Sequence, residues 1–320
     1  MKVLITGGHG FLGEILSRQL SIGHNVLSLG SSHGDLRTHG ALDKYLNEFK
    51  PDVVVALAAR LGGIGDNINH PSEYFLDNLQ IGVNTLNSFK NYSLSLNKNA
   101  RIILIGTVCS YPKSPPLPFK ELDFWNGYPE ETNGPYGIAK KAVSEYSFCL
   151  SRQFGVKCVN LLLTNLYGPK DDFRPETSHV IPALIRKVHH AKLNDLTSID
   201  VWGRGDTSRD FLYVHDASQV IKHFVEKYFG PNNYFNIGTG VEITLENLVS
   251  VICSKMEFNG AIKWNNKRPS GQPRRVLDNS RLRTEFDINF TSFDDGLAAT
   301  ISYYIDNQNE IHAQGPKFGV

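Results

Sequence analysis

The fold of this chain is decided by the stretch Thr6-Gly7-Gly8-His9-Gly10-Phe11-Leu12-Gly13, which has glycines at positions 7, 10 and 13. It directly follows Val3–Thr6, an apolar run that is typical of a buried strand. Glycines at this spacing allow a tight turn, bring backbone amides close to a pyrophosphate and let a helix pack near the sheet. The N-terminus of that helix adds a favourable dipole for an anion. The stretch predicts a dinucleotide-binding turn, and its strand-turn-helix context disfavours a tight turn without a ligand.

Strand-like and helix-like patterns alternate along the first half of the chain. Short β-branched runs predict buried parallel strands, and longer segments with apolar residues at helical spacing predict helices. This alternation predicts an α/β fold with a Rossmann-type doubly wound parallel sheet. The strands are expected at Val3–Thr6, Asn25–Leu29, Val53–Leu57, Arg101–Ile105 and Cys158–Leu163, and the helices at Phe11–Leu20, Gly40–Phe49, Ser72–Phe89 and Pro135–Phe154.

The pattern becomes less regular after Thr164, where prolines interrupt the sequence. Further helices are expected at Thr244–Lys255 and Phe293–Asn307. We predict a dinucleotide-binding Rossmann domain over residues 1–164 and, mainly, a smaller α/β substrate-binding lobe over 165–320. A segment of about residues 211–240 is expected to return to the first domain. Ligands in such folds bind outside the carboxyl ends of the strands.

Composition excludes several classes of partner. The chain of 320 residues has 33 Lys and Arg against 32 Asp and Glu, so no global field attracts nucleic acid or an acidic membrane. No apolar run approaches the roughly 20 residues of a membrane span, and the N-terminus reaches its glycines too soon for a signal peptide. The four cysteines lack metal spacing, so we expect no metal site. We expect a cytoplasmic protein in a reducing compartment.

The segment after the second expected strand indicates which dinucleotide binds. An acidic residue about 20 positions after the glycines would bind the ribose of NAD. Gly30-Ser31-Ser32-His33-Gly34 stands there instead, and the first carboxylate is Asp35. Because a carboxylate would repel a 2′-phosphate, whereas hydroxyls with His33 or Arg37 would accept one, the pattern favours NADP(H). The alternative is that this segment is only a solvated loop.

Tyr136 and Lys140 lie four residues apart near the start of an expected helix and therefore share one face. Lys140 would favour the phenolate and lower the pKa of Tyr136. Tyr136 could then donate a proton to a carbonyl oxygen as hydride arrives, or accept one in reverse. Thr107, after the strand Arg101–Ile105, could hydrogen-bond the same oxygen. The alternative is a surface pair, which the glycine turn upstream and the Thr107 hydroxyl disfavour.

With these residues the chain resembles the extended short-chain dehydrogenase/reductase superfamily. Further segments narrow the resemblance, and they are Ala58-Ala59-Arg60-Leu61-Gly62-Gly63-Ile64, Thr164-Asn165-Leu166-Tyr167-Gly168-Pro169, Ser178-His179-Val180-Ile181-Pro182-Ala183-Leu184, Val201-Trp202-Gly203, Arg209-Asp210-Phe211-Leu212 and Pro273-Arg274-Arg275-Val276-Leu277-Asp278. With these segments the chain resembles the GDP-L-fucose synthase family. The resemblance implies NADPH-dependent conversion of a GDP-4-keto-6-deoxy sugar by epimerisation at C3 and C5 and reduction at C4. The expected substrate is GDP-4-keto-6-deoxy-D-mannose, and the expected product is GDP-L-fucose.

The resemblance places the acid and base of epimerisation on Cys109 and His179. A C4 ketone acidifies the hydrogens on C3 and C5, and Tyr136 would steady the enolate oxygen. Cysteine and histidine both titrate near enough to neutral pH to give or take a proton. We expect His179 early in a helix after the capping residues Thr177 and Ser178. The alternatives are a packed cysteine and a surface histidine.

The same resemblance implies contacts to the ligands. Asn165 would face the sugar, Arg209 would hold the diphosphate, and Trp202 and Asp278 would line the nucleotide pocket. Lys187 stands where the family usually has arginine. The expected cofactor contacts, with the catalytic residues Tyr136, Lys140 and His179 among them, are Gly7, Gly10, Phe11, Leu12, Gly13, His33, Asp35, Leu36, Leu57, Ala58, Ala59, Asn165 and Leu166.

Departures from the family pattern leave the identity of the sugar open. Thr107 and Val108 replace serines, and Arg60 and Leu61 differ from the common residues near the substrate. A heptose or a dideoxy sugar would need only modest changes in the pocket. Val108 and Cys109 also stand where related 4,6-dehydratases have an Asp-Glu pair, which argues against dehydration.

Three rival functions remain open at this stage. The first is C4 reduction alone, the second is epimerisation with tightly bound NAD, and the third is a non-catalytic dinucleotide sensor. Tyr136 and Lys140 count against the sensor, and the missing carboxylate after the second strand counts against the NAD enzyme. The resemblance also suggests a homodimer through the two longest helices. The basic pairs Lys267-Arg268 and Arg274-Arg275 are interpreted as a solvated loop or a diphosphate rim, without nucleic acid.

Overall fold

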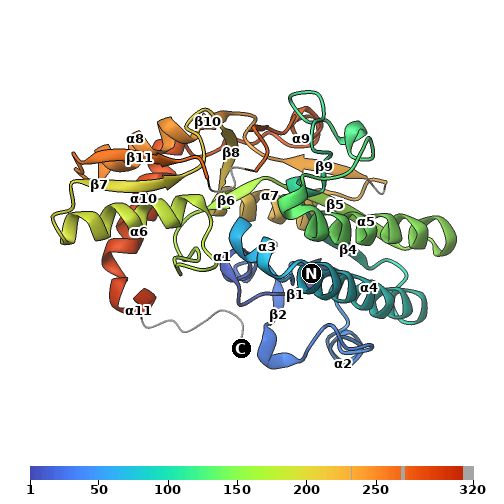
Figure 1. Cartoon of the computed structure of the whole chain (residues 1–320). Helices are drawn as coiled ribbons and strands as arrows, with labels where there is room; N and C mark the ends of the chain where they lie inside the picture. The colour runs from blue at the N-terminus through green and yellow to red at the C-terminus, as the bar shows by residue number, and fades with distance from the viewer. Residues whose placement is uncertain (232, 268–270, 313–320) are drawn as a thin grey trace.

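The computed structural model describes residues 1–231, 233–267 and 271–312, and its centre is a parallel sheet (Figure 1). The sheet has six strands in the order β2-β1-β3-β4-β5-β9, and every neighbouring pair is parallel. The predicted Rossmann-type doubly wound sheet is therefore confirmed. The strands are β1 (Lys2–Thr6), β2 (Asn25–Leu29), β3 (Val53–Ala56), β4 (Arg101–Thr107), β5 (Lys157–Leu163) and β9 (Tyr234–Ile237).

Helices cover both faces of this sheet because alternate side chains of each strand point to opposite sides. In β1, Val3 and Ile5 pack with residues of α1 and α7, whereas Leu4 packs with Leu86 of α4. All of these side chains are fully buried, so each strand contributes to two separate cores. The helices on the first face are α1 (Phe11–Leu20) and α7 (Val214–Lys227), and those on the second are α2 (Asp43–Phe49), α4 (Pro71–Ser95) and α5 (Gly134–Phe154).

A second group of elements builds its own core beside the large sheet, around Phe211, Ile252 and Leu297. Strand β8 pairs with β6, β10 and β12, and β7 pairs with β11. In Figure 1, helices α6, α8 and α10 lie with these strands, on the side away from α4 and α5. The elements are β6 (Asn165–Tyr167), α6 (Val180–Leu193), β7 (Ser198–Trp202), β8 (Ser208–Tyr213), β10 (Glu242–Thr244), α8 (Leu245–Lys255), β11 (Ala261–Asn265), β12 (Arg274–Arg275) and α10 (Phe293–Asp306), and the short helices of the chain are α3 (Ile64–Asn69), α9 (Ser280–Glu285) and α11 (Gln308–His312).

The chain returns to the first sheet after it has entered the second group of elements. Strand β9 pairs with β5, and α7 packs against α1 with its buried face. The boundary near residue 164 stays a prediction, because the two groups of elements share these segments.

Some element boundaries differ from the sequence predictions for local reasons. Strand β4 continues to Thr107 because its last residues pair with Leu162 and Leu163 of β5. Helix α2 begins at Asp43 rather than Gly40, whose φ of 74° lies in the left-handed region. Thr244 is the N-cap of α8, and its side chain accepts a hydrogen bond from the Asn247 amide at 3.2 Å. Helix α10 ends one residue early, and α4 extends beyond both predicted ends.

Close packing between α5 and the turn after β4 sets the geometry of the later site. A Cβ at Gly137 would lie 2.4 Å from the carbonyl oxygen of Cys109, so only glycine allows this approach. The Ser110 hydroxyl donates a hydrogen bond to the Gly137 carbonyl at 2.9 Å. The start of α5, including Tyr136, is thereby held against the turn that carries Cys109.

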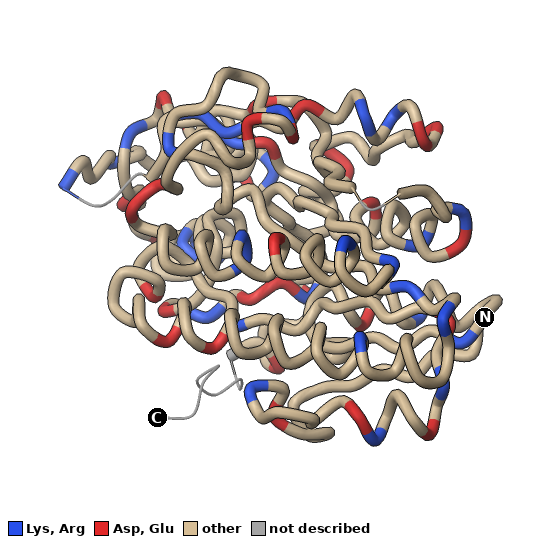
Figure 2. Tube along the Cα trace, turned by 90° about the vertical axis from the view of Figure 1, so that its right-hand side faces the viewer, with Lys and Arg blue, Asp and Glu red and all other residues tan. Residues whose placement is uncertain are grey.

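Charges of both signs are distributed over the whole molecule. Figure 2 shows Lys and Arg interspersed with Asp and Glu on the helices and the loops alike. Of the helices in the described residues, none has the length and apolar composition needed to cross a membrane. Local basic groups, and not a global field, must therefore hold any anionic ligand.

Candidate active site

The glycine-rich turn lies where the strand order of the large sheet reverses, between β1 and β3. Gly7 has a φ of 68°, and a Cβ at this position would lie 2.8 Å from the Ala58 amide nitrogen. The Gly10 amide donates to the Gly7 carbonyl at 3.1 Å, and the Leu57 amide donates to the Thr6 carbonyl at 3.2 Å. Phe11, Leu12 and Gly13 then open α1. The backbone forms a tight cradle at the edge of the sheet where such folds bind dinucleotides.

The segment after β2 presents hydroxyls and an imidazole in place of a carboxylate. Ser31–His33 form a short 3-10 turn. The Gly30 amide donates to Nδ1 of His33 at 3.2 Å, so Nε2 carries the ring proton in the neutral imidazole. The Tyr45 hydroxyl donates to the His33 carbonyl at 2.6 Å, and the rings of His9 and His33 lie 5.3 Å apart between centroids. His33 is therefore fixed as a hydrogen-bond donor beside the glycine-rich turn.

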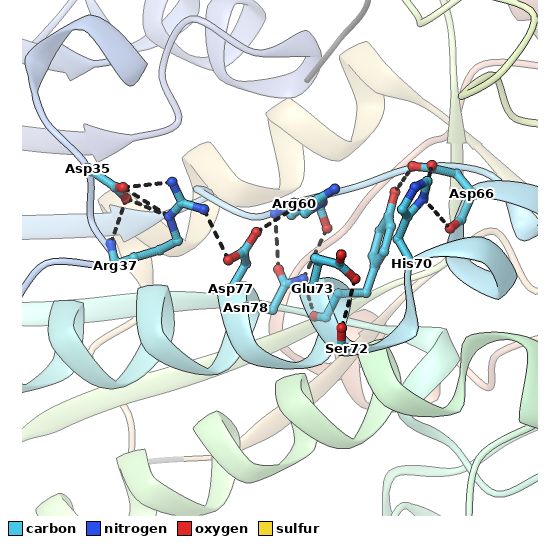
Figure 3. A network of polar contacts seen from close by, with 10 residues as sticks. Asp35, Arg37, Arg60, Asp66, His70, Ser72, Glu73, Asp77 and Asn78 are labelled. Carbon is cyan, nitrogen blue, oxygen red and sulfur yellow. Dashed lines mark hydrogen bonds and ion pairs between the residues drawn. The ribbon is translucent and has the colours of Figure 1, made fainter. Parts of the chain in front are cut away.

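Arg37 is bound to two carboxylates, as Figure 3 shows. Its Nε and Nη2 atoms donate to Asp35 at 3.0 and 2.8 Å, and Nη1 donates to Asp77 at 3.1 Å. Arg60 donates to the other oxygen of Asp77 at 2.9 Å and lies over the ring of Tyr74. The Arg37 hydrogen bonds lower the pKa of Asp35. Two sequence candidates could bind a 2′-phosphate, and Arg37 already shares its charge with two carboxylates. Among the described residues, no carboxylate forms an ion pair with His33.

The Tyr136–Lys140 pair lies in the first turns of α5, at the carboxyl end of β4. Tyr136 is 7% exposed, and burial lowers the pKa of Lys140 to about 8. The pKa of Tyr136 is raised by burial and by the neighbouring Cys109, and a hydrogen bond with Thr107 opposes this shift. The expected lowering of the Tyr136 pKa is wrong for this state, because burial has the largest influence and raises the pKa. Tyr136 is therefore a phenol at neutral pH, the form that can donate a proton.

Thr107 and Cys109 lie next to Tyr136 at the end of β4. The Thr107 hydroxyl oxygen accepts a hydrogen bond from the Cys109 amide at 3.1 Å. Cys109 is a half-buried free thiol, and Nη1 of Arg275 donates to its Sγ atom at 3.5 Å. The structure therefore brings together Thr107, Cys109 and Tyr136, and it adds Arg275 to them.

His179 is the N-cap of α6, with extended backbone angles, and does not lie inside the helix as expected. Thr177 does not cap the helix either, because its hydroxyl donates to Asp172 at 2.6 Å. The Thr177 carbonyl accepts a hydrogen bond from the Gly63 amide at 3.0 Å. This contact ties the segment of His179 to the Gly62-Gly63 turn.

The Gly62-Gly63 turn is itself held by buried polar groups. The Tyr74 hydroxyl donates to Asp66, whose other oxygen lies 2.8 Å from Nδ1 of His70 (Figure 3). Asn67 donates to the carbonyl oxygens of both glycines at 2.9 and 3.0 Å. Arg60, which is paired with Asp77, lies over the ring of the same tyrosine. Helix α4, which carries Tyr74 and Asp77, therefore links this turn to the loop after β2.

The residues expected to bind the substrate come from the second group of elements. Burial and the neighbouring Arg275 lower the pKa of Arg209 to about 9. Asn165 donates to the Asp210 carbonyl at 3.0 Å. Lys187 donates to the Asp200 carbonyl at 2.8 Å and lies over the ring of Trp202, which is 44% exposed.

These expected residues form two clusters rather than one. Arg209 and Arg275 lie beside Cys109, whereas Lys187 and Trp202 form a separate, more exposed platform. Asp278 follows β12, and its Oδ1 accepts from the Ser280 amide at 2.8 Å. The Asp278 amide donates to the Phe119 carbonyl at 2.9 Å.

Arg275 is the site residue that the sequence interpretation missed. It occurs in the segment Pro273–Asp278, where two adjacent arginines indicate only a solvated loop or the rim of a diphosphate site. In the structure Arg274 is exposed and paired with Glu242, whereas Arg275 is buried. Arg268, of the other basic pair, lies outside the described residues. Across 1–231, 233–267 and 271–312 no group of three His, Cys, Asp or Glu side chains is placed to hold a metal.

The chain matches the model of the NAD dependent epimerase/dehydratase family over residues 3–238 and belongs to that family. It is also 33% identical to a GDP-L-fucose synthase of Sinorhizobium fredii, over 96% of each chain. The predicted membership of the GDP-L-fucose synthase family is confirmed by this likeness.

Two solved structures show how widely the fold is shared. A GDP-6-OMe-4-keto-L-xylo-heptose reductase from Campylobacter jejuni is 25% identical, with a TM-score of 0.86 over 96% of this chain and 98% of that one. A GDP-L-fucose synthetase from Naegleria fowleri bound to NADP is 24% identical, with a TM-score of 0.84 over 96% and 95% of the two chains. These proteins have the same fold and are named for different sugars.

Proposed function

We propose that this protein is an NADPH-dependent epimerase-reductase that acts on a GDP-4-keto-6-deoxy sugar. The substrate proposed from the family is GDP-4-keto-6-deoxy-D-mannose, which it would convert to GDP-L-fucose. The observation that carries the proposal is the cluster at the end of β4, where Tyr136, Thr107 and Cys109 meet next to Lys140. An enzyme that only reduces C4 needs Tyr136, Thr107 and Lys140. The thiol beside them fits a second reaction, in which protons move.

The glycine-rich turn and its surroundings fit NADP(H). The cradle at Gly7 leaves no room for a Cβ, and the N-terminus of α1 faces the site of a pyrophosphate. His33 and the Ser31 and Ser32 hydroxyls suit a 2′-phosphate, in agreement with NADP in the Naegleria structure. The reduced nicotinamide supplies a hydride when it is bound. Leu36, Leu57, Ala58, Ala59 and Leu166 are proposed to complete the cofactor site.

For reduction, Tyr136 donates the proton that the C4 oxygen takes up. Its phenol is protonated at neutral pH because burial raises its pKa. Lys140, on the same face of α5, is charged below a pH of about 8 and stabilises the phenolate that forms. Thr107 donates a hydrogen bond to the same oxygen. Each residue therefore acts on charge that develops in the transition state.

For epimerisation, Cys109 and His179 are proposed as the two groups that exchange protons at C3 and C5. Removal of either hydrogen turns the C4 ketone into an enolate, whose oxygen Tyr136 and Thr107 stabilise. A base on one face and an acid on the other invert the carbon centre. Cys109 follows β4 and His179 caps α6, so two different parts of the fold supply them.

The substrate is proposed to lie between the two groups of elements. Asn165 faces the sugar, and Arg209 holds the diphosphate with a guanidinium that burial keeps out of water. Trp202 offers an exposed ring for stacking, supported by Lys187. Asp278 is proposed to line the nucleotide pocket.

A second candidate function is C4 reduction alone, on a different GDP-4-keto sugar such as a heptose or a dideoxy sugar. The likeness to the Campylobacter heptose reductase favours it. So do Thr107 and Val108, which depart from the serines of the GDP-L-fucose synthase family. In this case Cys109 and His179 would be present but unused.

The two candidates are separated by the product that forms from GDP-4-keto-6-deoxy-D-mannose and NADPH. We expect stoichiometric consumption of NADPH and a product whose proton couplings show inversion at both C3 and C5. A product that is reduced at C4 with both centres retained would support reduction alone. Failure to consume NADPH with this substrate, but consumption with a GDP-4-keto-heptose, would assign the heptose.

A homodimer and a cytoplasmic location remain proposals. Helices α4 and α5 pack together along one side of the molecule (Figure 1). Phe75, Leu76 and Leu94 on α4 and Phe154 on α5 are exposed large apolar side chains. A shared helical face of this kind suits an interface between two copies, and sedimentation of the purified protein would measure it.

A further inference from the structure

We propose that Arg275 holds Cys109 as a thiolate and so makes this cysteine a base. Arg275 is thus a positioning residue for epimerisation, and this role rests on the proposed function of Cys109. The proposal concerns the enzyme before substrate binds. It therefore differs from a role for Arg275 in holding the diphosphate.

The contact between the two side chains is a direct, partly buried hydrogen bond. Nη1 of Arg275 donates to Sγ of Cys109 at 3.5 Å, and Arg275 is only 5% exposed. The thiolate, and not the thiol, is the reactive form of cysteine, and a neighbouring arginine favours it. An opposite charge at this distance acts strongly where little water screens it.

Gln272 aims the guanidinium at the thiol. Its Oε1 accepts from Nε of Arg275 at 3.1 Å, while its Nε2 donates to the carbonyl oxygens of Pro112 and Lys113 at 3.1 and 2.6 Å. Gln272 is itself buried, and both the oxygen and the nitrogen of its amide form hydrogen bonds. Because Gln272 is neutral, it fixes the direction of Arg275 without cancelling the positive charge.

The adjacent Arg274 shows what a neutralised arginine looks like at this place. Its Nε donates to Glu242 at 3.1 Å, Nη2 forms an ion pair with the same carboxylate, and its side chain is exposed. Among the described residues no carboxylate forms an ion pair with Arg275. Arg274 is therefore neutralised at the surface of β12, whereas Arg275 brings its positive charge into the interior.

The groups that face Cys109 come from every element around it. Arg275 lies on β12, Arg209 on β8, Tyr136 on α5, and Glu130, on the segment before α5, also acts on Arg209. Burial first and Arg275 second lower the pKa of Arg209, so two cations share this small volume. Glu130 and Glu242 are carboxylates that act on Arg209, and a Cys109 thiolate would add an anion directly beside Arg275 before substrate binds.

The protons and electrons of the proposed step balance. The thiolate of Cys109 forms an S–H bond as the C–H bond at C3 or C5 breaks, and the electron pair moves to the C4 oxygen as an enolate. The His179 imidazolium then gives its proton to the opposite face of the carbon. Cys109 loses one proton to water and His179 gains one, which resets both groups.

The test measures the thiolate in the substrate-free enzyme. The thiolate fraction at neutral pH is read from the ultraviolet difference spectrum against Cys109→Ser, and the rate of alkylation of Cys109 by iodoacetamide is followed by peptide mass. We expect Arg275→Met to reduce the rate about tenfold, as an opposite charge this close predicts. Arg275→Lys should restore most of it, and the matched control Arg274→Met should leave it unchanged.

Two further measurements keep the proposal open to refutation. Gln272→Ala retains the buried charge but releases its direction, so we expect an intermediate loss of alkylation even if Arg275→Met folds poorly. An unchanged thiolate fraction in Arg275→Met and Gln272→Ala, with a raised KM for the GDP-sugar, would assign Arg275 to the diphosphate and overturn the proposal. Failure of the wild type to exchange protons at C3 and C5 would refute the epimerisation, yet it would leave the thiolate result standing.

Discussion

The proposed reductive pair, Tyr136 and Lys140, and the proposed proton-moving pair, Cys109 and His179, are built in different ways. Tyr136 and Lys140 lie one turn apart on α5, so a single helix sets their relative position. Cys109 follows β4 and His179 caps α6, so their positions depend on how distant segments pack. Burial shifts the pKa of both members of the first pair. The Sγ atom of Cys109, by contrast, accepts a hydrogen bond from Arg275, which comes from a third segment.

For one ketone to undergo both reactions, the protonation states of the two pairs must be controlled independently. A buried phenol must stay protonated to deliver a proton, whereas a base beside it must lose one. In the proposed mechanism these requirements are met separately, by desolvation of the phenol and by a cation beside the thiol. The following predictions test that separation, beginning with the largest expected effect.

Removal of the Tyr136 phenol should abolish most of the C4 reduction. We expect Tyr136→Phe to lower the rate of C4 reduction by about a thousandfold or more, because the proton donor is lost. The measurement is single-turnover oxidation of NADPH with saturating substrate. Binding of NADPH, followed by fluorescence, should persist as the control. Reduction at the wild-type rate would remove Tyr136 from the mechanism.

Removal of the Cys109 thiol should abolish most of the proton exchange at C3 and C5. Cys109→Ser should slow proton exchange at C3 and C5 about a hundredfold, because the hydroxyl is a far weaker base at neutral pH. Reduction of a ketone that is already epimerised should continue at close to the wild-type rate. Equal loss of both activities in this variant would show that the two pairs are not separable.

The two activities should also respond differently to pH. Since burial lowers the pKa of Lys140 to about 8, its charge is present below that pH and is lost above it. Reduction limited by the chemical step should therefore fall up to about tenfold per pH unit above 8. Proton exchange should follow a different pH profile, because it depends on the protonation of Cys109 and His179 and not on that of Lys140. Parallel pH profiles for both activities would contradict the assignment of Lys140 to reduction.

The charge of Lys140 should carry a cost in stability. Its pKa is about 8 in the folded state against 10.5 in the unfolded chain, so the unfolded state binds more protons between these values. Wild-type stability should therefore rise with pH across that window. We expect Lys140→Met to raise the free energy of unfolding at neutral pH by about 1–3 kcal/mol. The gain should vanish as the pH approaches 10.5, and urea unfolding at both pH values measures it.

The local features of this protein could be predicted from its sequence. The glycine spacing, the β-branched runs and the Tyr136–Lys140 spacing each depend on neighbouring residues, and the fold they predicted is confirmed. Helix α1 has the predicted bounds because the turn before it and Leu20 at its end are local signals.

The remaining features depend on contacts that no spacing reveals. The N-cap position of His179 follows from where Thr177 meets Gly63. The pairing of Arg37 with Asp77 requires α4 to lie beside the loop after β2. Arg274 and Arg275 cannot be told apart in the sequence, because the strand β12 decides which side chain points inward.

The central claim is that a single site holds one ketone through proton exchange and then through reduction. Conversion of GDP-4-keto-6-deoxy-D-mannose with NADPH in deuterated water tests it most directly, with the product examined by NMR. The account predicts deuterium at both C3 and C5 of the reduced sugar. A reduced product that carries hydrogen at both positions would contradict it.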